Sequence, residues 1–275
     1  MTDNQETNDV EKAKSLVSTG SELAGAAVGG AIGFLAAGPV GAAGAGTLGV
    51  LVSKVGAKLL GDYAERRLSD RERVRVGAAA AIAFDRISGS AEQGETPRED
   101  GFFDPKDDGR SAADEVLEGT LRRARDEYQE KKVALLGSFY ANVAFSPGVT
   151  VEEANYYLRL FDDLTYRQLC VICLLFMKPY QSKLSELRKG DYRANTQGMS
   201  ADTLTLLQEI FGLYNRGLVA CRTVEGEGYS ALLGWHDVIP AQLELTGLGD
   251  RFQKLFMAGG TFQYRDVQAV ANLLR

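Results

Sequence analysis

The 275-residue sequence has little of what most catalytic and metal sites require. It contains one histidine, His236, which follows Trp235, and no Ser-His-Asp arrangement is visible around it. Three cysteines, Cys170, Cys173 and Cys221, are too few for a disulfide framework and suit a reducing compartment. We therefore expect no catalytic residues, no cofactor and no disulfide-stabilised secreted fold.

The sequence also lacks the charge patterns that mark nucleic-acid binding or secretion. Its net charge is -6, so no basic field over the whole protein attracts phosphates. Residues 1–22 have a net charge of -3 and form a polar arm. Because no basic segment precedes the apolar residues that follow, we expect no secretory signal peptide.

Residues 23–53 carry no charged side chain at all, although charged residues make up 25% of the sequence. Within the Gly/Ala-rich segment 23–61, small residues recur every fourth position, which places them on one face of a helix. The residues predicted to pack in this way are Gly25, Gly29, Gly33, Gly41, Ala45, Gly49 and Ser53.

This spacing resembles the glycine-zipper segments of membrane-associated and membrane-disrupting bacterial proteins. In lipid, a stripe of small residues lets two helices approach backbone to backbone. Gly38-Pro39 interrupts the segment, and a 14-residue half-helix would be about 21 Å long, short of the ~30 Å hydrocarbon core. We therefore expect a glycine-rich helical hairpin or a kinked span rather than a standard transmembrane helix.

Basic residues follow the uncharged segment directly. Clustered basic side chains beside an apolar segment bind anionic lipid head groups, at about 1 kcal/mol each. The residues predicted to do so are Lys54, Lys58, Arg66, Arg67, Arg71, Arg73 and Arg75.

Two other interpretations of the Gly/Ala segment stay open. It could form the packed centre of a soluble helical bundle or a seam between copies, with the arginines as a solvated face. A dinucleotide-binding loop is disfavoured, because no β-strand precedes the glycines and no β-α-β pattern follows.

The rest of the chain predicts helices and four regions: 1–22, 23–61, 62–145 and 146–275. Capping patterns predict a helix from Ser69 to about Ile87, one from Ser111 to about Phe145, and further helices after Thr150 and Thr165. Residues 89–110 read as a loop or disordered linker.

The last 75 residues predict helix, strand, turn, strand and helix. Gly217 is a natural helix C-cap, and "LVACRTV" and "LELTGLG" are β-like. This order resembles a winged-helix domain, with Leu218-Val219 entering the wing and Leu245-Thr246-x-x-Gly249 leaving it. Residues 200–217 contain Arg216 as their only basic residue, so we expect this module to bind protein rather than DNA.

Two residue patterns that are typical of metal sites and acid-base sites are better explained by structural roles. Cys170-x-x-Cys173 has metal-ligand spacing, and Cys221 and His236 would complete a zinc site only if the fold joined them. The apolar setting of both thiols favours plain core packing. The paired carboxylates Glu152-Glu153 and Asp162-Asp163 lie near helix ends with capping neighbours, where roles in the helix dipole and in solvation are the default.

Together these observations predict a mainly α protein: a glycine-rich helical hairpin plus long helices, then a winged-helix-like domain with a small β-hairpin. We expect a non-enzymatic, cytoplasmic protein that associates peripherally or conditionally with the inner membrane. Such a design resembles toxin-like or phage-defence effectors, in which a second module controls a membrane-active segment. The alternative is a soluble adaptor or regulator that binds protein.

Overall fold

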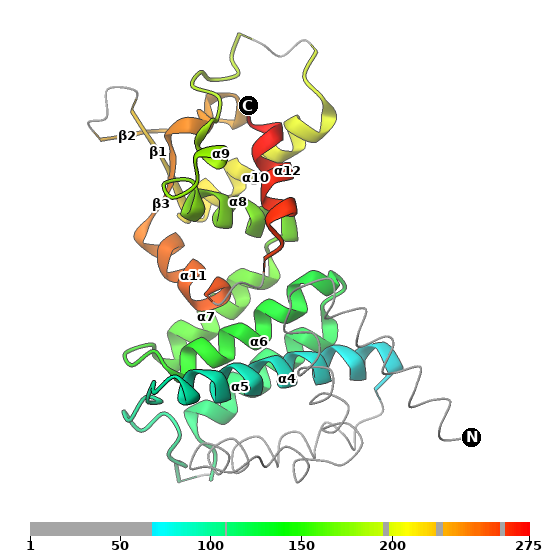
Figure 1. The fold of residues 1–275 in the computed structure, drawn as a ribbon, viewed down its shortest axis with the longest axis vertical. Coiled ribbons are helices and arrows are strands. Elements are labelled where there is room, and N and C mark those ends of the chain that lie inside the picture. Colours follow the sequence, from blue (N-terminus) through cyan, green and yellow to red (C-terminus); the bar gives the residue numbers. More distant parts are fainter. Residues whose placement is uncertain (1–67, 108, 195–197, 224–227, 259–261) are drawn as a thin grey trace. The chain divides into compact units, whose positions relative to one another are not determined.

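The computed structural model describes residues 68–107, 109–194, 198–223, 228–258 and 262–275 (Figure 1). These residues are mainly helical and include one small antiparallel sheet, as the sequence predicts. The predicted glycine-rich hairpin, residues 23–61, lies outside them. Among the described residues, no helix is both long enough and apolar enough to cross a membrane.

The chain divides into two compact units. The first comprises residues up to Asp163 together with Leu255–Thr261, and the second comprises Leu164–Lys254 with Phe262–Arg275. Residues 146–163, which the sequence assigns to the C-terminal module, therefore belong to the first unit.

The described part of the first unit contains the helices α4 (Asp70–Glu92), α5 (Ala112–Asp126), α6 (Glu130–Ala144) and α7 (Val151–Asp162). Helix α4 packs against α5 and α6, and α5 packs against α7. The predicted capping box at Ser69 is present, with the Ser69 hydroxyl accepting from the Glu72 N–H and the Glu72 carboxylate accepting from Ser69. The helix runs five residues beyond its predicted end at Ile87.

The single long helix predicted from Ser111 to about Phe145 is wrong, because the chain breaks between α5 and α6. Glu127 takes an extended conformation and is buried, and its carboxylate lies 2.7 Å from the Lys132 ammonium group, which is 2% exposed. The helical periodicity is continuous on both sides of this break, so the pattern alone does not reveal it.

The loop predicted at 89–110 is present from Gln93 onward, but it is anchored rather than disordered. Arg98, whose side chain is 6% exposed, donates to the Val149 carbonyl at 2.8 Å and pairs with Asp100. The Phe102 ring of the same loop is buried, and its centre lies 4.4 Å from the Arg98 guanidinium. Hydrogen bonding to Arg98 lowers the Asp100 pKa to about 2.

Helices α4 and α6 meet at unusually small residues. A Cβ atom at Gly137 would lie 2.5 Å from the Ala79 carbonyl oxygen, a distance that real Cβ atoms essentially never show. The facing stretch of α4, residues 77–83, is fully buried and consists of glycine, alanine and one isoleucine. The chain thus uses small residues for close helix packing within a folded unit.

The second unit contains helices and a three-stranded sheet. Its helices are α8 (Tyr166–Met177), α9 (Ser182–Ser185), α10 (Ala201–Asn215), α11 (Gly247–Met257, in this unit as far as Lys254) and α12 (Tyr264–Leu273). Strands β1 (Val219–Arg222), β2 (Tyr229–Ser230) and β3 (Leu243–Leu245) are arranged in the order β2-β1-β3, and two short 3-10 helices, Trp235–Asp237 and Pro240–Gln242, lie between β2 and β3.

The predicted strands at "LVACRTV" and "LELTGLG" are confirmed as β1 and β3. They pair antiparallel, with Val219 opposite Leu245. The sequence did not predict β2, which pairs with the other edge of β1. Gly217 has a φ of 71°, which confirms the predicted left-handed position after α10.

The Leu-Thr-x-x-Gly stretch joins α10, the sheet and α11. The Thr246 hydroxyl donates to the Gly217 carbonyl and accepts from the Gly249 N–H at 3.0 Å. A Cβ at Gly249 would lie 2.0 Å from the Leu218 carbonyl oxygen, so only glycine permits this approach of α11 to the sheet. In the described fold, the motif therefore serves to hold the start of α11 against the sheet.

We expect Gly137→Ala to reduce the free energy of unfolding by about 1–3 kcal/mol, because the added methyl group must push α4 away from α6. Urea unfolding followed by circular dichroism measures this. Gly89→Ala is the matched control: Gly89 lies in α4 with open space around it, and alanine there should add up to about 1 kcal/mol. Equal effects of the two substitutions would contradict the close approach.

Candidate functional site

Most of the predicted membrane-interaction residues lie outside the described residues. This applies to the whole small-residue stripe and to Lys54, Lys58, Arg66 and Arg67. Of the predicted head-group ligands, the structure describes Arg71, Arg73 and Arg75, and their contact with lipid stays a prediction.

These three arginines occupy the first turns of α4 and differ in their surroundings. The Arg71 side chain is 78% exposed and has a loose 3.6 Å contact with Glu130. Arg73 is exposed and has no partner among the described residues. Arg75 instead donates to the Arg125 and Glu127 carbonyls at the end of α5, at 3.0 and 2.5 Å. The helix therefore presents two guanidinium groups to solvent and uses the third to hold α5.

The thiols and the histidine do not form a metal centre in the described part of the chain, which holds no group of three or more His, Cys, Asp or Glu side chains placed to bind a metal. Cys170, Cys173 and Cys221 are buried and form no disulfide. Burial raises the pKa of Cys173 to about 12, so this thiol stays protonated and behaves as a core side chain.

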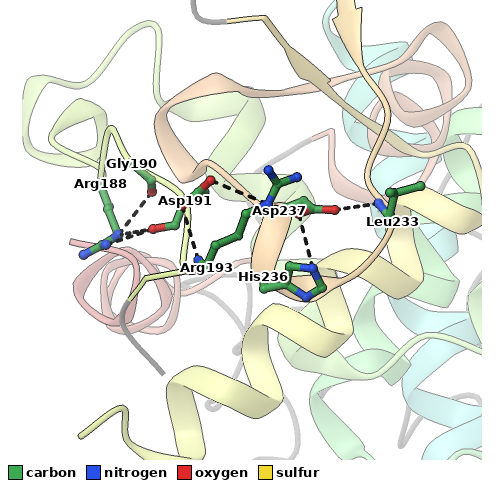
Figure 2. Close-up of polar contacts among 7 residues, drawn as sticks. All are labelled: Arg188, Gly190, Asp191, Arg193, Leu233, His236 and Asp237. Carbon is green, nitrogen blue, oxygen red and sulfur yellow. Dashed lines mark hydrogen bonds and ion pairs between the residues drawn. The ribbon is translucent and has the colours of Figure 1, made fainter. Parts of the chain in front are cut away.

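His236 instead belongs to a network around a buried carboxylate, that of Asp237 (Figure 2). Arg193 donates to Asp237 at 2.6 Å, and the Leu233 N–H donates at 2.8 Å. The His236 Nε2 lies 3.4 Å from the same carboxylate. The Asp237 side chain is 4% exposed, so the network fixes the segment from Leu233 to Asp237 against the loop that carries Arg193.

A second contact set holds that loop in place. The Arg188 guanidinium donates to the Gly190 and Asp191 carbonyls, as Figure 2 shows, and lies 4.6 Å from the centre of the Tyr192 ring. The Tyr192 N–H donates to the His236 carbonyl at 2.9 Å. The segment 188–193 thus braces the segment after β2.

The electrostatics of this network keep the Asp237 carboxylate charged. Burial raises the Asp237 pKa, but hydrogen bonds from Arg193 and the Leu233 N–H outweigh it and hold the pKa below its ordinary value. Within the part of the chain that the structure describes, the His236 imidazole bonds to no hydroxyl or thiol. Asp237 and Arg193 are 44 residues apart, so no local sequence signal could have joined them.

Helix α10 presents an outer surface with few charged side chains. Four residues face the core: Leu206, Leu207, Ile210 and Leu213. The exposed side chains include Leu204, Thr205 and Gln208, with Asp202 in the first turn and Arg216 at the C-cap. Phosphate binding requires positive charge, and Arg216 is the one exposed basic side chain of this surface among the described residues.

Comparisons with known proteins do not narrow the assignment: no family model, no curated protein and no solved structure matches this chain.

We expect Asp237→Asn to lower the stability of the second unit by about 1–3 kcal/mol at pH 7, because two charge-assisted hydrogen bonds to the carboxylate are weakened. The folded-state pKa is lowered, so the carboxylate's contribution is complete above the unfolded-state pKa of about 4 and is lost as pH falls through the folded-state value. The difference between wild type and variant should therefore shrink below about pH 4.

Fluorescence of Trp235, the chain's only tryptophan, reports this unfolding directly because it adjoins His236. Asp202→Asn, on the surface of α10, is the control and should change stability by less than about 0.5 kcal/mol. A stability difference that does not vary with pH would argue against the charged network.

Proposed function

We propose that this protein is a non-enzymatic, membrane-interacting protein. Its Gly/Ala-rich segment, residues 23–61, associates with the inner membrane from the cytoplasm, and its C-terminal module binds a protein partner that controls the association. The likeness to toxin-like or phage-defence effectors extends this to permeabilisation of the membrane.

The observation that carries the membrane proposal is the exposure of Arg71 and Arg73, which belong to the series of basic residues, Lys54 to Arg75, that follows the uncharged segment. Both guanidinium groups are free to meet anionic head groups, since one has a single loose contact and the other has no partner among the described residues. Small residues four apart in residues 23–61 support helix association in lipid.

The C-terminal module supports a winged-helix interpretation. Helix α10 precedes β1, a hairpin joins β1 and β2, and β3 returns along β1 before α11. The contacts of Thr246 and Gly249 explain why the Leu-Thr-x-x-Gly signature stands at the exit from the sheet. The outer surface of α10 has Arg216 as its one exposed basic side chain among the described residues, which favours protein over DNA as the partner of this module.

The second candidate is a soluble adaptor whose Gly/Ala segment packs internally or joins copies. The close approach of α4 to α6 at Gly137 favours it, because the same chain already packs small residues helix against helix without lipid. The two candidates differ in whether the protein binds to lipid vesicles: the membrane protein should bind, and the soluble adaptor should not.

Flotation of the purified full chain with phosphatidylglycerol-containing vesicles, with dye leakage in the same sample, tests the proposal. We expect the wild type to float. The double variant Arg71→Gln/Arg73→Gln should bind with a partition coefficient roughly thirtyfold lower, since each basic residue contributes about 1 kcal/mol. Arg159→Gln/Arg265→Gln, which removes two exposed charges elsewhere, is the matched control and should float like the wild type.

A folded protein that does not float at low ionic strength would favour the adaptor. Gly29→Leu/Gly33→Leu then separates the candidates further. Overfilling a packed soluble core should unfold the adaptor, whereas in a membrane protein it should leave the described units folded and reduce leakage.

A further inference from the structure

The outer edge of β2 is open in the second unit. The sheet order is β2-β1-β3, so β2 pairs with β1 on one side, and no described strand pairs with its other side. Tyr229, in this strand, is 62% exposed, and Leu233, four residues further on, is 83% exposed.

The hydrogen-bond alternation shows which backbone groups of this edge are available. The Thr223 N–H donates to the Gly228 carbonyl at 3.1 Å, so the pair of Thr223 and Gly228 is hydrogen-bonded. Arg222 and Tyr229 are therefore a non-hydrogen-bonded pair, and Cys221 and Ser230 are the next bonded one.

The other side of β1 gives the same alternation. The Thr246 N–H donates to the Leu218 carbonyl, so the even-numbered residues of β1 direct their backbone groups toward β3. Hence no backbone hydrogen bond joins Arg222 to Tyr229. The backbone N–H and C=O of Tyr229 therefore point away from β1, toward the open edge.

Burial alternates in the same way along residues 229–233. Tyr229, Ala231 and Leu233 are exposed, whereas Ser230 is half-buried and Leu232 is 6% exposed. Strand β2 itself ends at Ser230, and from the continued alternation of burial we infer that Ala231 also directs its backbone groups outward. The Leu233 N–H, by contrast, is bonded to Asp237. Tyr229 and Ala231 are therefore the two residues with free edge groups.

Residues 229–233 lack two of the features by which proteins block strand pairing, since they contain no charged residue and no proline. Among the described residues, the charges beside Tyr229 neutralise each other, since Arg222 pairs with Glu244, and the Glu244 carboxylate also accepts from the Tyr229 hydroxyl at 2.8 Å. A two-fold axis here would bring no net charge of this patch against its own copy.

We propose that this edge pairs antiparallel with the same edge of a second copy of the chain, joining two sheets across a two-fold axis at Ser230. Tyr229 lies opposite Ala231 of the partner subunit, and each of the two such pairs exchanges two N–H···O=C bonds. The pairing is self-complementary, because a large ring meets a methyl group on each side of the axis.

Sedimentation of the full chain from about 5 to about 500 µM tests the association, which should be weak because the contact is small. We expect the wild type to dimerise. Ala231→Lys, which charges the edge, and Ala231→Pro, which removes the outward N–H without touching a bond of the fold, should raise the dissociation constant at least about tenfold. Ala269→Lys, at an exposed alanine on α12, is the matched control and should have no effect.

Oxidative cross-linking tests the register. Facing residues at Ser230 would have Cα atoms about 4.5 Å apart, within the range of a disulfide. Ser230→Cys should therefore form covalent dimers much faster than Ala269→Cys. The proposal fails if the wild type stays monomeric over the whole range, if the Ala231 variants dimerise like the control, or if the two cysteine variants cross-link equally.

Discussion

The first unit depends on one buried ammonium group, the Nζ of Lys132. It lies 2.7 Å from the Glu127 carboxylate and 4.7 Å from the centre of the Phe161 ring. Phe161 stacks on Phe256 with ring centres 4.5 Å apart, and Phe256 stacks on Phe139 at 4.4 Å. Because an unpaired buried charge costs several kcal/mol, Glu127 must leave the helix to reach Lys132, and the break between α5 and α6 follows. The ring column extends this constraint from α6 and α7 to residue 256.

The second unit depends on a backbone contact instead. Gly249 brings the start of α11 against the Leu218 carbonyl, and Thr246 ties the same turn to Gly217. These contacts orient β1 between its two neighbours, and the Asp237 network then fixes the chain after β2. The outward direction of the Tyr229 backbone N–H and C=O results from this strand order. Alternate residues of β1 direct their backbone hydrogen bonds toward β3 and toward β2, and Tyr229 lies opposite a residue that bonds toward β3.

Local signals were sufficient for much of this architecture and failed where distant residues decide. Ser69 and Thr165 cap helices through neighbours three residues away, and Gly217 ends a helix through its own φ, so the sequence predicts all three. The anchored loop depends on Arg98 reaching a carbonyl 51 residues away, and the helix break depends on burial of Glu127. A local sequence pattern predicts neither a contact between residues so far apart in the chain nor the burial of a single charged side chain.

The same limit applies to the small residues, which occur in two settings. In α4, residues 77–83 are a short uncharged run that finds its partner, Gly137, within the same unit. Residues 23–53 are uncharged over 31 positions, longer than any described helix. A soluble partner for so long a run would need an equally long apolar surface, whereas a bilayer supplies one without any matching sequence. The basic residues at its end would then hold the segment at the head groups, because their charges cannot follow it into hydrocarbon.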